Sequence, residues 1–219
     1  RSMIFMPTDD EKNPGVFIVM DKIESTKPEY KKTFLLHSKV EPIIDGNTTI
    51  IERTDTGYNG RLTVKTLYPE NPVLNPIGGP GRQWEIHGTN IPPQGAYDPS
   101  TINENMNISW GRIEISPSVE QKEDFFLNAM YVSDADTERD LYEAETIETD
   151  LVLGAKMLDK VAVFAKEQTR ISKKFSFNFE SDEVCDIADT GIKEGKWNVL
   201  KNEKKISEET SYNEGGMIY

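Results

Sequence analysis

Two arginines, a tryptophan and a histidine form the most promising chemical group in this sequence. They are Arg82, Trp84, His87 and Arg112, with Trp110 beside the last of them. Aromatic side chains can pack against sugar rings, and Arg or His can bind the acidic substituents of those rings. If these side chains share one exposed surface, they predict a binding site for an acidic sugar. The alternative is that the tryptophans belong to the core and the arginines cover a sheet.

The sequence has only two histidines, His37 and His87, and a single cysteine, Cys185. No disulfide can form within the chain, and no cysteine-rich zinc site can be built from it. His37 and Asp21 each close an apolar stretch, so they could meet as metal ligands or as an acid and a base. A hydrogen-bonded structural histidine is the simpler interpretation. We therefore predict no catalytic residue, no metal and no cofactor in this chain.

Two loops resemble ion-binding motifs. Residues 134–145 carry acidic side chains at EF-hand-like spacing, but Arg139 stands where a calcium loop needs glycine. Residues 77–82 are rich in glycine, as in a phosphate-binding loop, yet no helix start follows them. A solvated acidic loop and a tight structural turn are the alternatives.

The elements that would position these groups are β-strands. Apolar and polar residues alternate with a period of two in many short stretches, which is typical of strands with one buried face. The stretches 16–20 and 124–132 are apolar on both faces and are expected to be covered on both sides. No stretch has a convincing helical period. Strands are predicted at residues 1–6, 16–22, 33–38, 49–52, 61–67, 112–116, 124–132, 149–153, 160–165, 173–179 and 196–200.

Frequent turn signals between these stretches predict an all-β fold. We expect a two-sheet antiparallel β-sandwich formed by a single domain over residues 1–219. Residues 69–99 hold seven of the twelve prolines and five of the fifteen glycines, so a long loop is expected there. Residues 134–150 hold eight carboxylates and one arginine, which predicts an exposed acidic loop.

The formal net charge is −13, from 38 Asp and Glu against 25 Lys and Arg. This charge opposes binding to nucleic acid and to anionic membrane surfaces. No apolar run approaches the roughly 20 residues that span a bilayer. The chain begins in the middle of an apparent strand, so we expect it to be a piece of a longer protein whose export signal lies outside it.

Several short motifs follow one another in a familiar order. They lie at residues 1–7, 17–23, 30–38, 60–62, 66–69, 77–81, 87–92 and 110–117. This succession resembles the C-terminal β-domain of heparinase II/III-like polysaccharide lyases. The resemblance covers residues 1–133 well, and the remainder follows only by its strand pattern.

The resemblance implies a parent enzyme in which an N-terminal (α/α) toroid domain, missing here, is joined to this β-region. Such an enzyme cleaves uronic-acid-containing polysaccharide of the heparin or heparan sulfate kind by β-elimination. A base removes the C5 proton of the uronate and an acid protonates the leaving oxygen. The family's catalytic Asn, Tyr and His lie in the toroid and just before this segment, so none is transferred to this chain. The implied partner is an acidic polysaccharide, and the implied location is periplasmic or secreted.

The acidity of the chain departs from the usual composition of that family. A polyanionic substrate would be repelled unless a basic strip were present. Lys27, Lys31, Lys32 and Lys39 form the best such strip within the chain, although lysines also guard ordinary sheet edges. The alternative function is a non-catalytic carbohydrate-binding or surface-interaction β-sandwich module.

Overall fold

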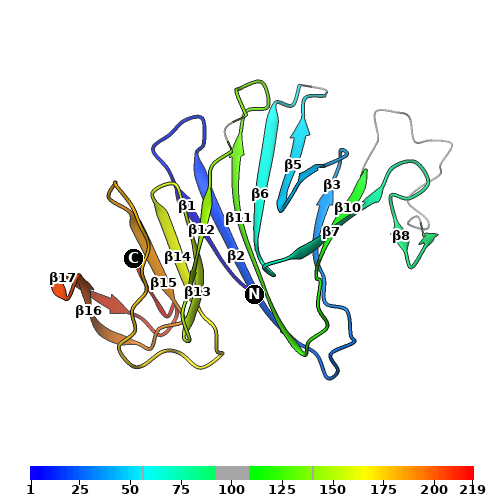
Figure 1. Cartoon of the computed structure of the whole chain (residues 1–219). Coiled ribbons are helices and arrows are strands. Elements are labelled where there is room, and N and C mark those ends of the chain that lie inside the picture. The colour runs from blue at the N-terminus through cyan, green and yellow to red at the C-terminus, as the bar shows by residue number, and fades with distance from the viewer. Residues whose placement is uncertain (56, 92–108, 140) are drawn as a thin grey trace.

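The computed structural model describes residues 1–55, 57–91, 109–139 and 141–219 (Figure 1). Within these ranges every regular element is a β-strand, and all but one of the strand pairs are antiparallel. The predicted all-β, sandwich-like fold is confirmed. No helix in these ranges is long and apolar enough to cross a membrane.

A six-stranded antiparallel sheet forms the centre of the molecule. Its two longest strands pair from Glu123 opposite Glu24 to Tyr131 opposite Val16. In spatial order, the strands are β1 (Ser2–Pro7), β2 (Gly15–Glu24), β11 (Glu123–Ser133), β6 (Gly60–Tyr68), β5 (Thr48–Arg53) and β4 (Ile43–Asp45).

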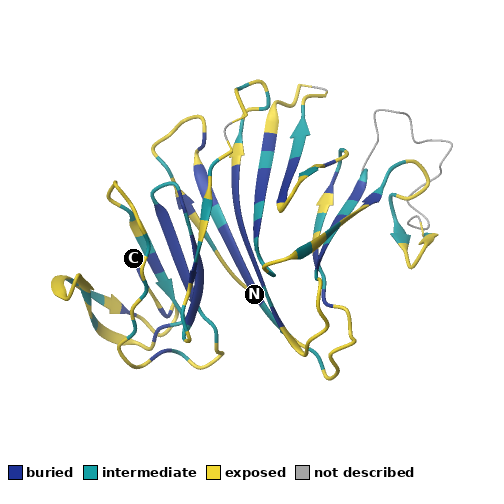
Figure 2. Cartoon of the chain, in the orientation of Figure 1, coloured by how far each residue is buried: buried dark blue, intermediate teal, exposed yellow. Residues whose placement is uncertain are grey.

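Both faces of β2 and β11 are buried, as the dark strands in Figure 2 show. One face contributes Ile18 and Leu127 to a core cluster. The opposite face contributes Val19 and Phe126 to a second cluster. The prediction that these two stretches are covered on both sides is therefore confirmed, because successive side chains of a strand point to opposite faces.

A three-stranded sheet covers the second of these faces. Its strands, in spatial order, are β3 (Phe34–Ser38), β10 (Gly111–Pro117) and β7 (Pro72–Gly78). Residues 72–78 are thus a strand and not part of the loop predicted over 69–99, of which 92–99 lie outside the described residues. The prolines Pro72 and Pro76 are compatible with β7 because it is an edge strand, where one side of the backbone needs no partner.

A five-stranded sheet covers the first face. Its strands, in spatial order, are β12 (Ala144–Glu148), β13 (Val152–Met157), β14 (Lys160–Ala165), β15 (Asp186–Thr190) and β18 (Met217–Ile218). β12 falls inside the acidic loop predicted over residues 134–150. It forms a strand there because Ala144 and Ile147 pack into clusters on opposite faces of the sheet.

Two hairpins complete the fold at opposite ends of the molecule (Figure 1). They are β8 (Glu85–Ile86) with β9 (Thr89–Asn90), and β16 (Gly195–Lys201) with β17 (Lys204–Ser211). The second hairpin covers the outer face of the five-stranded sheet together with Phe175, Phe177 and Phe179. These three rings stack in a row, with centroids 6.4 and 6.2 Å apart, but residues 173–179 form no strand. The molecule therefore has more layers than the two sheets predicted.

Candidate functional site

Three of the four predicted sugar-binding residues lie on the β8–β9 hairpin or directly before it. Arg82 and Trp84 precede β8, and His87 lies in the turn between the two strands. His87 and Gly88 have φ angles of 49° and 80°, the left-handed pair that a two-residue type I′ turn requires. The hairpin therefore carries the His87 imidazole at its exposed tip.

Arg112, the fourth predicted residue, ties this hairpin to β10. Its Nη1 donates a hydrogen bond of 2.6 Å to the backbone carbonyl of Glu85. The carboxylate of Glu85 accepts hydrogen bonds of 2.6 and 3.1 Å from Arg82. The structure thus brings the two arginines together at Glu85, a residue that sequence reasoning missed. Its position three residues after Arg82 was the available signal.

Carboxylates occupy both guanidinium groups. Arg112 donates through Nε and Nη2 to Glu114 Oε1 at 3.0 and 2.7 Å, and Lys31 Nζ donates to Oε2 at 2.8 Å. Burial raises the pKa of Glu114, but hydrogen bonds from Lys31 and Arg112 outweigh it and lower that pKa overall. The hydrogen bond from Arg82 likewise lowers the pKa of Glu85. An acidic sugar at this surface would have to compete with two carboxylates.

The two neighbouring tryptophans are half-buried. Trp110 packs closely on Gly78, where an added Cβ would lie 2.4 Å from the indole Cε3. The backbone N–H of Trp84 donates to Asn90 Oδ1 at 2.9 Å, which helps to close the hairpin. The packing alternative therefore describes Trp110, and Trp84 remains the aromatic candidate beside Arg82.

His37 and Asp21 lie in different sheets. Asp21 is inside β2 and accepts two hydrogen bonds of 2.8 Å from Arg1. His37 is exposed on β3, directly opposite Arg112. In the described ranges, no group of three or more His, Cys, Asp and Glu side chains is arranged to hold a metal ion.

The acidic loop is built around an arginine. Arg61 is buried, and its guanidinium donates to the backbone carbonyls of Ala135 and Thr137 at 2.7 and 3.1 Å. Its Nε also pairs with Glu52 Oε1 at 2.6 Å. The loop carbonyls that could bind a calcium ion therefore already accept hydrogen bonds from the Arg61 guanidinium. The EF-hand-like spacing therefore forms an arginine-centred loop.

Residues 77–82 form a structural turn. Gly79 and Gly81 have φ angles of 85° and 77°. The N–H of Gly79 donates to the Trp110 carbonyl at 2.8 Å, and that of Arg82 donates to the Gly79 carbonyl at 3.0 Å. Because these N–H groups are already used and no helix follows, the loop is not a phosphate cradle.

The lysines predicted as a basic strip are largely neutralised. Lys32 is buried and lies 3.0 Å from Asp124. Lys31 pairs with Glu114, as described above, and Lys27 lies 3.7 Å from Glu29. The exposed pairs of Lys27 and Lys31 are consistent with the sheet-edge alternative, whereas Lys32 belongs to a buried ion pair.

The comparisons with known proteins point to the C-terminal part of the chain. Residues 146–219 match the family model of the heparinase II C-terminal domain. No curated protein matches the chain. The matched segment runs from within β12 to the end of the chain and contains the outer β16–β17 hairpin. This segment is the part of the chain whose resemblance to the lyase β-domain rested only on its predicted strand pattern.

The match supports a heparinase II-like C-terminal domain over residues 146–219, about a third of the chain, and does not include residues 1–133. The matched segment is thus similar to a domain of a polysaccharide lyase, and the fold that surrounds it is all-β and sandwich-like.

Proposed function

We propose that this chain is the C-terminal β-region of a polysaccharide lyase that cleaves uronic-acid-containing polysaccharide by β-elimination. The observation that carries the proposal is the match of residues 146–219 to the heparinase II C-terminal domain. The all-β layered fold is consistent with such a region. A periplasmic or secreted location, where such polysaccharides are met, is part of the proposal.

The chemistry requires a base near C5 of the uronate, an acid near the leaving oxygen, and a group that neutralises the carboxylate. The two histidines of the chain, His37 and His87, are both exposed, and neither has a hydrogen-bond partner in the part of the chain that the structure describes. Among the described residues, no second group therefore orients either imidazole for proton transfer. On this basis the chain supports the groove, and the acid and base belong to a preceding (α/α) toroid.

Within this role, the β8–β9 hairpin is the element that reaches toward substrate. Arg112 anchors it to the sheet, while the Arg82 side chain is 54% exposed and could exchange Glu85 for a sugar carboxylate. Trp84 supplies an adjacent ring, and His87 extends from the tip. Each of the four predicted residues then has a distinct position in one binding wall.

The proposal is tested by following the ultraviolet absorbance of unsaturated uronate with heparin, heparan sulfate and alginate as substrates. The 219-residue chain alone is expected to give no turnover. The same protein extended upstream to include a helical toroid is expected to be active on at least one of them. Robust turnover by the chain alone would contradict the division of labour, and an inactive extended protein would contradict the lyase assignment.

The second candidate is a carbohydrate-binding module without catalysis. The exposed position of the β8–β9 hairpin favours it, because Arg82 and His87 are accessible in the chain as it stands. The two functions are separated by the extended protein, which would bind acidic oligosaccharide but release no unsaturated product if only binding occurs.

A further inference from the structure

A lysine-rich pocket lies at the end of the molecule opposite the β8–β9 hairpin. It has a volume of about 230 Å³ and sits beside the start of β16. Four lysines and one carboxylate surround it, in a chain whose net charge is −13. Its main lining residues are Lys173, Lys174, Lys193, Glu194, Lys196 and Trp197.

An isolated β-bridge brings the two sides of this pocket together. Ile171 pairs with Ile192, and both are buried in the cluster under the outer layer. The N–H of Ile171 donates to the Gly191 carbonyl at 2.8 Å, and the N–H of Lys193 donates to the Ile171 carbonyl at 2.9 Å. Residues 172–174 are therefore held beside residues 193–196 by the core, and the pocket does not depend on side-chain contacts alone.

Trp197 is fixed at the wall of the pocket. Its indole Nε1 donates to the Lys193 carbonyl at 2.9 Å. Phe175 meets the indole edge-to-face, with the ring centroids 6.3 Å apart. The ring is half-buried, so it offers a pre-positioned apolar surface next to the ammonium groups.

Three of the lysines have no internal counter-ion. Lys196 pairs with Glu208 at 2.8 Å. Lys173, Lys174 and Lys193 are exposed and form no ion pair with any residue that the structure describes. Gathering like charges without carboxylate partners is unfavourable unless an anion joins them.

We propose that this pocket binds one acidic ring of a polysaccharide, as a second site remote from the β8–β9 hairpin. The ammonium groups would hold carboxylate or sulfate oxygens, since each carries three rotatable donors, and Trp197 would contact the C–H face of the ring. The volume lies below the roughly 300–1,000 Å³ of drug-sized ligand sites, which suits a single ring. The choice of polymer rests on the proposed function.

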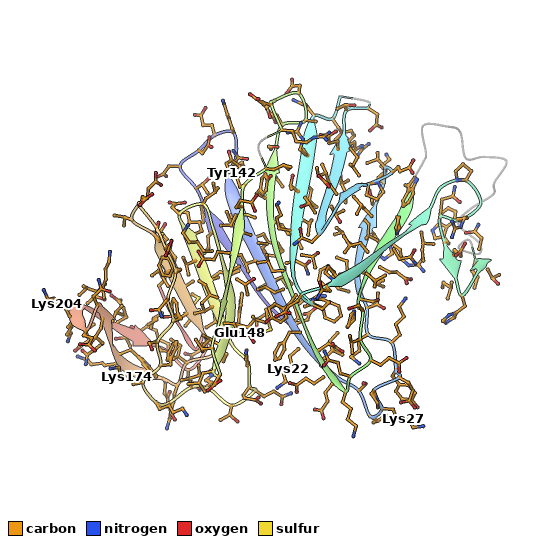
Figure 3. The ribbon with its side chains drawn as sticks, viewed as in Figure 1. Lys22, Lys27, Tyr142, Glu148, Lys174 and Lys204 are labelled. Carbon is orange, nitrogen blue, oxygen red and sulfur yellow. The ribbon has the colours of Figure 1, made fainter. Side chains whose placement is uncertain are left out.

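The test compares two variants with the same change of charge. In the pocket variant, Lys173, Lys174 and Lys193 are replaced by glutamine. In the control variant, Lys201, Lys204 and Lys205 at the tip of the same hairpin are replaced by glutamine, and Figure 3 shows Lys204 there, away from Lys174. Both variants and the unchanged chain are titrated calorimetrically with a heparin-derived hexasaccharide, a sulfate-free guluronate oligomer, neutral cellohexaose, inorganic sulfate and a short single-stranded DNA.

The 219-residue chain should bind the acidic oligosaccharides, with amide chemical-shift changes at residues 172–174 and 193–197, and should not bind cellohexaose. The pocket variant should weaken binding about tenfold, equivalent to about 1.4 kcal/mol, and the control variant should change it little. Trp197→Phe, with its fold checked by circular dichroism, should also weaken binding.

Four outcomes would overturn the proposal. They are equal losses in the two variants, shift changes confined to the β8–β9 hairpin, binding of inorganic sulfate as tight as that of the oligosaccharides, and equal binding of a short single-stranded DNA. These outcomes test the pocket proposal alone, because it is measured as binding by the 219-residue chain. The proposed lyase function is measured separately, as turnover by the extended protein. Binding confined to the β8–β9 hairpin would leave that function intact.

Discussion

Asp189 places a carboxyl group in an apolar layer. It lies on β15 opposite Val163, and Ile187 precedes it on the same face of the strand. Its Oδ1 is buried and has no hydrogen-bond partner in the described structure. Burial raises the pKa of Asp189 from 3.8 to about 7. An ionised carboxylate at this position therefore opposes folding.

The pH dependence of stability should reveal this residue. The unfolded chain ionises Asp189 near its ordinary pKa, whereas the folded chain does so about three units higher, so stability falls as the pH rises between the two values. At about 1.36 kcal/mol per unit, the cost approaches about 4 kcal/mol above about pH 7. We expect Asp189→Asn to raise the free energy of unfolding in urea at about pH 8 and to change it little at about pH 4.

Asp186 on the same strand supplies a control of opposite sign. Its carboxylate is exposed and accepts a hydrogen bond of 2.6 Å from Lys160, which lowers its pKa. The stability that this hydrogen bond contributes is present above the ordinary pKa of an aspartate and is lost when acid protonates the Asp186 carboxylate. Asp186→Asn should therefore destabilise the chain at neutral pH only. An Asp189→Asn effect that is equal at both pH values would contradict the buried-carboxyl interpretation.

At the scale of elements, Arg61 organises the loop that follows β11. Breaking a buried ion pair by removing one partner typically costs about 3–5 kcal/mol. We expect Arg61→Met to lower the free energy of unfolding by about 3 kcal/mol, because Glu52 loses its buried donor and several loop carbonyls lose theirs. Chemical denaturation measures this loss.

Arg139 provides the matched control, since it binds the same Glu52 at 2.8 Å but is 41% exposed. An exposed pair contributes at most about 1 kcal/mol. Arg139→Met should therefore cost much less than Arg61→Met. Equal costs for the two substitutions would show that burial of Arg61 does not govern this loop.

The β8–β9 hairpin should depend on Arg112 in the same way. A hydrogen bond to a charged group contributes about 1.5–3 kcal/mol, so its loss should speed local amide exchange by about tenfold or more. We expect Arg112→Met to accelerate hydrogen exchange at residues 85–91, while Arg82→Met, which removes a more exposed contact, does so less. If hydrogen exchange at these residues is unchanged in Arg112→Met, the hairpin is stable without its contact to Arg112.

The alternation of apolar and polar residues predicts some strands correctly and others wrongly. The pattern predicts β14 to the residue, because an apolar run ends sharply at Ala165 and a charged pair, Asp159 and Lys160, precedes it. It misses β7, since prolines argue against a sheet interior and only the tertiary arrangement puts that strand at an edge. It wrongly predicts a strand at residues 173–179, because alternation fixes which face a side chain takes but not whether a neighbouring strand exists.

That the candidate residues lie near one another could be predicted from the sequence, but the carboxylates that pair with the two arginines could not. The sequence places Arg82 and Trp84 close to His87 and suggests that Arg112 joins them. It does not show that Glu85 and Glu114 occupy the guanidinium groups, because that depends on how the hairpin folds back onto β10. The spacing of two between Arg112 and Glu114 puts both on one face of a strand, which is the signal that was overlooked.

For the whole molecule, the central sheet couples the two ends of the chain. The three-stranded sheet with the β8–β9 hairpin packs on one of its faces, and the five-stranded sheet of the matched segment packs on the other. The matched segment buries Leu153, Met157 and Phe164 against β2 and β11. Without that sheet, residues 146–219 would expose an apolar face. We therefore predict that the chain unfolds as one cooperative unit.

The three tryptophans can report the two ends separately. Trp197 lies in the matched segment, whereas Trp84 and Trp110 lie at the other end. In the Trp197→Phe variant, the tryptophan fluorescence comes only from Trp84 and Trp110. In a variant with both Trp84 and Trp110 replaced by phenylalanine, it comes only from Trp197. Thermal unfolding followed by fluorescence should give coincident midpoints for the two reporters.

Leu127→Ala should then lower both midpoints together. Leu127 is fully buried on β11 in the cluster that joins the central sheet to the five-stranded sheet. Such a truncation costs about 2–5 kcal/mol, or roughly 10 °C for a chain of this size. Leu200→Ala on the outer hairpin, where the side chain is 46% exposed, should move neither midpoint appreciably. If Leu127→Ala shifts only one reporter, or if Trp197 reports a transition of its own, residues 146–219 fold as a separate domain, and the single-domain organisation predicted for residues 1–219 is wrong.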